Sequence, residues 1–336
     1  MSRHCRVFFP TPSLTFGFVE SIQTIDAHMH LDHLARNLRV GRPYDLNSVL
    51  DCCMSYQDGG EGRRPLFKLV GVVAVFCDPP ELQLLRDWDQ YFQLVEDSCM
   101  YVSFGLHPKK VPYVIEGDNL SPVFIEDLSR CLSWENDVAL GEVNIDSSTK
   151  MVPLETQEAA LIQLFKEFKT ELVEKDLPVV LHCRNSNGSY DATLSAMAIV
   201  EAVLGNAQMI QFHYFNGDAA EVTMWLDKFT FTYFSIPVRI EMPQSMRQRK
   251  GWLKIPKERI LLEFDPPHGA LEGNTSPYDL PQDCGSLAQT LGLSKRDLLQ
   301  LACDNAKEFF RLNMIDCLFR QAQSIFMMIS GLVKIE

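Results

Sequence analysis

The stretch TIDAHMHLD, residues 24–32, places His28 and His30 at the end of a short apolar run. If residues 22–27 form a strand, side chains two positions apart project from the same face, so both imidazoles can hold one metal ion. A His-x-His pair alone is equally consistent with two surface histidines in a loop. Four later segments favour the metal site, because each ends an apolar run with another residue type that binds metals.

These four residues are carboxylates or imidazoles at the ends of predicted strands: Glu142 after residues 138–141, His182 in LPVVLHCR, His213 in MIQFHYF and Asp265 in RILLEFD. Eight such apolar runs alternate with amphipathic helical patterns along the chain. This alternation predicts a single (β/α)₈ barrel whose active face is built from the loops that follow the strands. An open doubly wound sheet is the alternative, but neither GxGxxG nor GxxxxGK[ST] occurs to mark its usual nucleotide site.

The composition is that of an ordinary globular enzyme, with 336 residues, 46% hydrophobic and 22% charged. The formal net charge of −13 argues against a protein that coats nucleic acid by bulk electrostatics, but it leaves room for a metal site that handles one phosphate locally. We expect a disordered extension over residues 1–21, the barrel over 22–312 and a helical apolar tail over 313–336.

Cysteine usage and the termini indicate where the protein resides. Ten cysteines occur without a CxxC pair, which favours a reduced cytoplasmic or nuclear setting over a disulfide framework. The basic, proline-interrupted N-terminus gives weaker support to mitochondrial targeting. The apolar stretch SIFMMISGLV near the C-terminus is shorter than the roughly 20 residues that span a bilayer. We therefore expect no membrane association, and nothing in the sequence indicates a protein partner.

The six candidate ligands, His28, His30, Glu142, His182, His213 and Asp265, exceed the needs of one tetrahedral ion. A carboxylate can bridge two ions about 3.5–4 Å apart, as in two-metal phosphoesterases. The ligand set therefore predicts two divalent ions, and it does not choose among Mg²⁺, Mn²⁺ and Zn²⁺.

The chain resembles the TatD family of metal-dependent deoxyribonucleases, within the amidohydrolase-like barrels, from about residue 22 to 312. The resemblance rests on IDAHMHLD, GLHP (105–108), ALGEVNID (139–146), VVLHCR (179–184), HYFNG (213–217), LLEFDPP (261–267) and NAKEFF (305–310). It implies that His28, His30 and Asp265 hold one metal, that His182 and His213 hold the second, and that Glu142 bridges them. Two departures stand out: the family's Gly-Leu-Asp after the bridging glutamate is Asn144-Ile145-Asp146 here, and its Thr-Asp-Ser/Ala-Pro is Phe264-Asp265-Pro266-Pro267.

Two residues are candidates for contacts with a substrate phosphate. The family match favours this role for His107 over that of a loop residue that satisfies the backbone. Arg184 shares a strand face with His182, and its alternative is a salt bridge to Asp146 or Glu142. Asp32 and Asp146 are predicted to orient histidines, and His33 is predicted to lie at the surface.

The leading functional prediction is a phosphodiester hydrolase acting on DNA from a 3′ end, with RNA as an alternative substrate bound locally at the metal site. Asp265 is the candidate general base, because an aspartate can bind a metal through one oxygen and accept a proton through the other, and Glu142 is the second candidate catalytic residue. The alternatives are an amidohydrolase-type enzyme for a small ester, lactone or amide, and a non-catalytic barrel scaffold. A scaffold has no physical need for six convergent ligands.

Overall fold

The computed structural model describes residues 22–39, 67–79, 100–134, 137–186, 188–238, 245–266 and 284–312. The predicted extension and the predicted tail lie outside these residues. So do residues 44–56 and 81–97, whose apolar spacing predicts two helices. Eight parallel strands form one sheet, whose members in spatial order are β1 (Ile22–Met29), β2 (Phe67–Phe76), β3 (Met100–Phe104), β6 (Asp137–Asp146), β7 (Val179–Arg184), β8 (Ile210–Phe212), β9 (Thr232–Pro237) and β10 (Ile260–Glu263).

The first and last strands meet, so the sheet curls into a barrel. Asp265 N donates a hydrogen bond to His28 O at 3.1 Å, and His30 N donates to Pro266 O at 3.1 Å. These bonds join the ends of β1 and β10 in place of a regular ladder. The single (β/α)₈ barrel predicted from the sequence is confirmed, and with it the proximity of residues 28 and 265.

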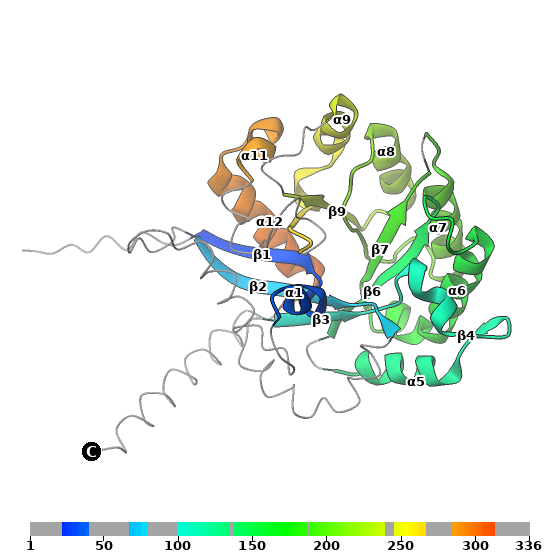
Figure 1. Cartoon of the computed structure of the whole chain (residues 1–336). Coiled ribbons are helices and arrows are strands. Elements are labelled where there is room, and N and C mark those ends of the chain that lie inside the picture. The colour runs from blue at the N-terminus through cyan, green and yellow to red at the C-terminus, as the bar shows by residue number, and fades with distance from the viewer. Residues whose placement is uncertain are drawn as a thin grey trace, which may run out of the picture.

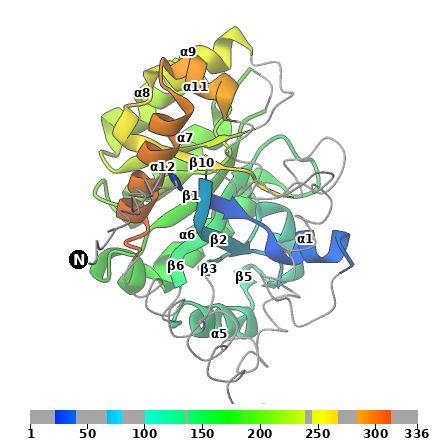
Figure 2. The same ribbon diagram turned by 90° about the vertical axis from the view of Figure 1, so that its left-hand side faces the viewer.

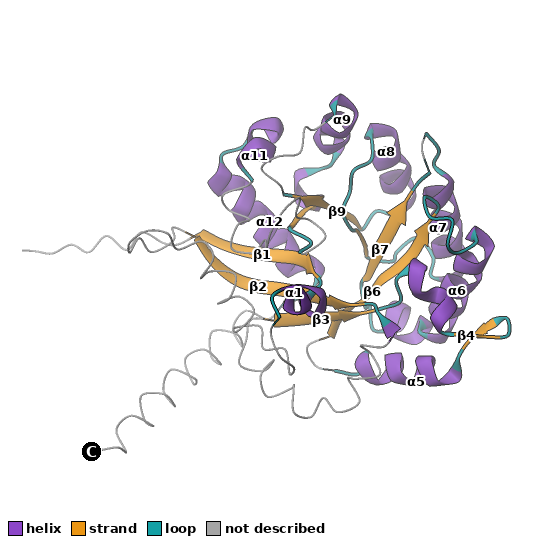
Figure 3. Ribbon diagram, in the orientation of Figure 1, coloured by secondary structure: helices purple, strands orange, loops and turns teal. Residues whose placement is uncertain are grey.

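The helices lie mostly outside the strands, as Figures 1 and 3 show. They are α1 (Leu31–Asn37), α5 (Pro122–Cys131), α6 (Leu154–Glu167), α7 (Asp191–Val203), α8 (Ala219–Lys228), α9 (Met246–Lys254), α11 (Gly285–Leu291) and α12 (Lys295–Phe309). Short helical turns η2 (Pro108–Tyr113), η3 (Thr170–Glu174) and η4 (Lys257–Arg259), and a hairpin of β4 (Ile115–Glu116) and β5 (Asn119–Leu120), complete the described elements. In the view of Figure 2, α5 lies at the opposite end of the molecule from α9 and α11.

Alternation along the strands decides which side chains face the barrel interior. Val180 of β7 and Leu261 of β10 belong to one buried cluster, whereas their immediate neighbours in sequence belong to another. Because side chains in a strand alternate between faces, His182 lies on the same face as Val180, and Glu263 on the same face as Leu261. Both chemically active side chains are therefore directed to the interior side of the sheet.

Some predicted boundaries differ from the structure, among them those of one strand and one helix. The predicted strand at 138–141 stops before Glu142, but β6 continues to Asp146, and its register with β7 shifts between Gly141 and Val143. The apolar spacing from Pro153 to about Lys175 predicts one long helix, which the structure divides into α6 and the π-helical turn η3. Among the described residues, no helix is long and apolar enough to cross a membrane.

Candidate metal centre

Glu142 lies at the centre of the site, and two glycines allow its strand to approach its neighbours. A Cβ atom on Gly105, in the GLHP segment, would lie 2.5 Å from the backbone oxygen of Glu142. A Cβ on Gly141 would lie 2.3 Å from Cβ of Val180 on β7. Both distances are shorter than any normal contact, so only glycine permits this packing, which sets the position of the Glu142 carboxylate.

The two carboxylate oxygens of Glu142 face different sets of imidazoles. Oε2 lies 3.6 Å from His28 Nε2 and 3.4 Å from His30 Nε2. Oε1 lies 4.0 Å from His213 Nε2 and contacts His182 Nδ1. A carboxylate with imidazole nitrogens on both sides has the arrangement that a bridging ligand requires.

Asp265 completes the side occupied by His28 and His30. Its Oδ1 lies 3.7 Å from His30 Nε2, and this buried oxygen has no hydrogen-bond partner. The backbone of Asp265 has φ of 53°, in the left-handed region where aspartate is one of the better tolerated residues. The six predicted ligands are thus brought together, and their exposed fractions range from 0% at His28 to 8% at His182.

Glu263 is a further member of the site that the sequence interpretation missed. Its Oε2 lies 3.0 Å from His213 Nδ1, and its Oε1 accepts a hydrogen bond from Tyr214 N at 2.7 Å. The signal was present, because Glu263 precedes Asp265 by two residues in LLEFD and the strand period of two places both on one face. His28, His213 and Glu263 also lie close enough to offer atoms to a shared ion.

The buried charges of the site favour occupation by a cation. Burial lowers the pKa of His28 and His213 to about 3, so both imidazoles are neutral at pH 7 and offer lone pairs. Burial, together with the nearby carboxylates Glu263 and Glu142, raises the pKa of Asp265 to about 8 against the opposing charge of His30. The neutral imidazoles of His28 and His213, the crowded carboxylates and the unpartnered Asp265 oxygen fit a divalent metal ion.

Residues 25–311 match the family described as TatD related DNase. The chain belongs to this TatD family. It is 25% identical over 266 residues to the human 3'-5' RNA nuclease TATDN2, a match that covers 76% of this chain and only 29% of the human protein. It is 24% identical over 192 residues to the 3'-5' ssDNA/RNA exonuclease TatD of Rahnella sp. (strain Y9602), covering 53% of this chain and 66% of that one.

A solved structure supports the fold of this TatD-family chain. The crystal structure of the TatD homologue YjjV from Escherichia coli K12 superposes with a TM-score of 0.62 and 19% sequence identity. The superposition covers 86% of this chain and 98% of that one. At this identity the likeness shows the barrel fold alone.

The departure from the TatD pattern at Asn144 has a structural explanation. Its backbone has φ of 126°, a conformation that favours glycine, the residue that the family commonly has after the bridging glutamate. The Asn144 side chain is 3% exposed, and neither its Nδ2 nor its Oδ1 has a hydrogen-bond partner. Asn144 thus stands at a backbone position that would suit glycine better.

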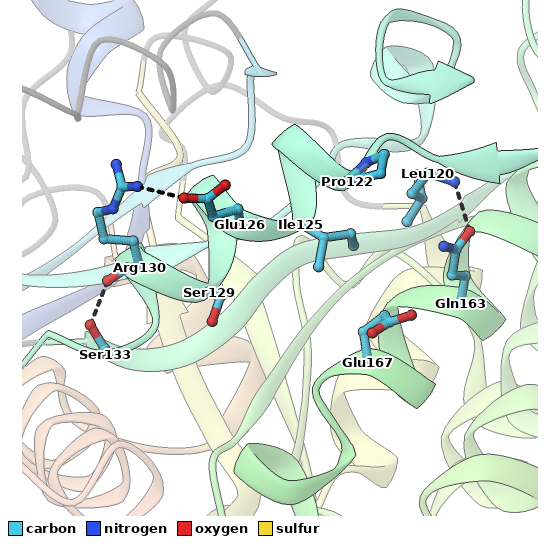
Figure 4. Close-up of a pocket in the computed structure, with 9 residues that line it drawn as sticks. All are labelled: Leu120, Pro122, Ile125, Glu126, Ser129, Arg130, Ser133, Gln163 and Glu167. Carbon is cyan, nitrogen blue, oxygen red and sulfur yellow. Dashed lines mark hydrogen bonds and ion pairs between the residues drawn. The ribbon is translucent and has the colours of Figure 1, made fainter.

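A cavity of about 410 Å³ opens onto the metal centre of this TatD-family chain. Its walls include both predicted phosphate contacts, His107 and Arg184, together with Lys109 and Lys110. His107 Nε2 lies 3.8 Å from Glu142 Oε1, whereas Arg184 is exposed at the cavity wall. A second cavity, of about 660 Å³, lies between α5 and α6, and Figure 4 shows that the residues lining it include no imidazole. The larger cavity therefore lacks the chemistry of the smaller one.

The two aspartates that were predicted to orient histidines, Asp146 and Asp32, each contact a different histidine. Asp146 Oδ2 lies 3.5 Å from His182 Nε2, in agreement with its predicted role. Asp32 Oδ2 instead lies 3.5 Å from His33 Nε2. The predicted surface position of His33 is wrong, because its side chain is only 18% exposed and its ring stacks on His30 with 4.9 Å between centroids. The short helix α1 turns His33 back over the site.

The sequence clusters Arg239, Arg247, Arg249, Lys250 and Lys254 beside Trp252, a pattern that predicts a solvated helix face, with a site for single-stranded nucleic acid as the alternative. Trp252 is 4% exposed and its Nε1 donates a hydrogen bond to Phe215 O at 3.2 Å. Arg247 is exposed and bonds Asp218 Oδ2 at 3.0 Å. Arg249, Lys250 and Lys254 are exposed too, in agreement with the predicted solvated helix face. Arg239, the other basic residue of the predicted patch, lies outside the described residues.

Proposed function

We propose that this chain is a metal-dependent phosphodiester hydrolase that removes nucleotides from the 3′ end of single-stranded DNA or RNA. The observation that carries the proposal is the Glu142 carboxylate, whose two oxygens face separate sets of imidazoles. The substrate class is that of the human and Rahnella relatives, which are a 3'-5' RNA nuclease and a 3'-5' ssDNA/RNA exonuclease.

The residues suit two divalent ions, which we propose to be Mg²⁺, Mn²⁺ or Zn²⁺. His28, His30 and Asp265 would hold one, His182 and His213 the other, and Glu142 would contact both. When bound, such ions lower the pKa of water towards about 7 and offset the negative charge that phosphate oxygens develop during hydrolysis.

The protein side chains supply positioning and proton transfer. Asp265 lies buried at the end of β10, and we assign it as the base that takes the proton from the attacking water. His107 and Arg184 line the same cavity and would contact the non-bridging oxygens of the substrate phosphate, where positive or hydrogen-donating groups stabilise developing charge. Glu263 keeps the His213 ring oriented through the Nδ1 contact.

A nuclease assay tests the proposal directly. Purified protein is incubated with 3′- or 5′-labelled single-stranded DNA, double-stranded DNA and RNA, in Mg²⁺, Mn²⁺ or EDTA. We expect stepwise shortening from the 3′ end of single strands with metal and none in EDTA. Asp265→Asn serves as the inactive variant, and Asp227→Asn, at an exposed position on α8, is its charge-matched control.

The assay also separates the alternative functions. Cleavage of small esters, lactones or amides without any effect on nucleic acid would place the chain among amidohydrolase-type enzymes. Metal binding without turnover of any of these substrates would indicate the scaffold. Either result would overturn the proposed nuclease function.

A further inference from the structure

Two lysines next to His107 occupy the mouth of the metal cavity on either side of strand β3. Lys109 Nζ lies 3.4 Å from Asp146 Oδ2, and Lys110 Nζ lies 3.2 Å from Asp78 Oδ2. Asp146 ends β6 and Asp78 follows β2, and these are the two strands that neighbour β3 in the barrel. The two ammonium groups therefore extend in opposite directions along the rim, one on each side of His107.

The turn that carries the lysines is held in place at its start. His107 N donates to Cys77 O at 3.1 Å, and the His107 Nδ1 atom accepts from Lys109 N at 3.1 Å. Pro108 and Pro112 restrict the backbone of η2 further. The turn therefore presents its two ammonium groups from a defined backbone.

The lysines remain accessible although their partners are not. Their side chains are 39% and 37% exposed, whereas Asp146 and Asp78 are 0% and 11% exposed. An ammonium group has three donors, so one carboxylate contact leaves donors for a ligand in the cavity. Because the carboxylates already restrict the lysines, less side-chain entropy is lost when a ligand binds.

The chemistry of this rim is that of an anion site in an otherwise acidic protein. The chain carries a formal net charge of −13, yet its metal cavity is lined by Lys109, Lys110 and Arg184. Glu142 and Asp265, both proposed as metal ligands, are more deeply buried in the same cavity. Cations at the rim reduce the repulsion that a polyanion meets on its way to that depth.

We infer that Lys109 and Lys110 bind backbone phosphates adjacent to the phosphate that is hydrolysed. This inference rests on the proposed nuclease function. The lysine contacts would make the enzyme selective for oligonucleotides over diesters that carry a single phosphate. The hydrolysed phosphate lies at the metal centre near His107. A strand that is cut at its 3′ end continues only on the 5′ side of that phosphate, so this part of the strand passes along the rim that carries both lysines. Such contacts are independent of base sequence.

The test compares two double variants on two substrates. Lys109→Gln with Lys110→Gln removes both rim cations, and Lys166→Gln with Lys169→Gln removes two exposed lysines at and just beyond the C-terminal end of α6 as the charge-matched control. The substrates are a single-stranded oligonucleotide and bis(p-nitrophenyl) phosphate, which has one phosphodiester. For the rim variant we expect KM on the oligonucleotide to rise about 10-fold or more, with kcat and the activity on the small diester retained.

Salt dependence provides a second readout. The slope of log kcat/KM for the oligonucleotide against log salt concentration should become shallower by about 0.7 for each phosphate of the single strand that a lysine no longer neutralises. The single variant Lys110→Gln is the cleaner probe, because Asp78 contacts His33 and Lys110, whereas Asp146 also contacts the candidate ligand His182. Metal content is measured on every variant.

The outcomes are distinct. An unchanged oligonucleotide KM and salt slope in the rim variant, with an active wild type, would overturn the inference and leave the nuclease function standing. Equal losses on both substrates with reduced metal content would also overturn it, since the lysines would then act through Asp146 on His182. A wild type that cleaves neither DNA nor RNA would refute the proposed function itself.

Discussion

Oε2 of Glu263 lies 3.0 Å from Nδ1 of His213, on the side of the ring opposite to Glu142. The carboxylate accepts a hydrogen bond from Nδ1–H, which leaves the lone pair of Nε2 directed towards Glu142 Oε1 at 4.0 Å. The same glutamate accepts a hydrogen bond from Tyr214 N at 2.7 Å, so it fixes both the ring and the backbone that follows it. A carboxylate in this position selects one tautomer and one orientation of a metal-binding histidine.

Glu263→Gln should weaken the metal held by His213. Glutamine has only one acceptor oxygen, so it can serve either the imidazole or the Tyr214 amide, and its NH₂ group faces the other donor. We expect metal affinity to fall about 10- to 100-fold, the usual effect of removing such a partner. Competition with a fluorescent chelator measures this, with the exposed Glu126→Gln on α5 as control. Unchanged affinity would show that Glu263 does not position His213.

Glu142→Gln and His182→Ala should differ in the number of ions that remain bound. Glu142 faces both sets of imidazoles, so its replacement should lower metal content from two ions per chain towards zero. His182 contacts only the Oε1 side, so its replacement should leave one ion. Elemental analysis after dialysis against metal-free buffer gives the stoichiometry. Equal metal content in the two variants would argue against a bridging role for Glu142.

Asp265→Asn should retain part of the bound metal and lose most of the activity. The amide keeps one oxygen that can face a metal but cannot accept the proton of water. General-base assistance contributes about 10² to 10⁴ in rate, so kcat should fall by that factor. Single-turnover cleavage of an end-labelled strand and metal analysis are measured on the same preparation. A variant with normal metal content and wild-type kcat would exclude Asp265 as the base.

Asn144→Gly should stabilise the protein. Residue 144 has φ of 126° and carries a buried amide without hydrogen-bond partners. Relief of backbone strain and removal of the unsatisfied amide each favour glycine by about 1–3 kcal/mol, whereas the added freedom of glycine in the unfolded chain opposes this by about 0.5–1 kcal/mol. Chemical denaturation should show a net gain of about 1 kcal/mol or more. A fall in stability would mean that the Asn144 side chain packs favourably.

The sequence was sufficient to predict the candidate ligands that lie at the carboxyl ends of strands. Each of the six candidate ligands lies at or next to the carboxyl end of an apolar run, and parallel strands in a closed barrel bring those ends to one face. The length of the runs and the helical patterns between them were therefore enough to predict the barrel. They were also enough to place His28 and Asp265, 237 positions apart in the chain, beside each other.

The tertiary structure decided the orientations and contacts of the site residues, because these depend on irregular backbone and on neighbouring strands. The register shift around Glu142 and the close approach of Gly105 set which oxygen faces which histidine, and neither is visible in a periodic pattern. The partial burial of His33 and the contacts of Lys109 and Lys110 arise from segments that fold back over the rim. The sequence by itself determined which residues gather at one face, because periodicity and strand polarity are local. Only the three-dimensional packing decided how they are oriented, because orientation depends on neighbours far away in the chain.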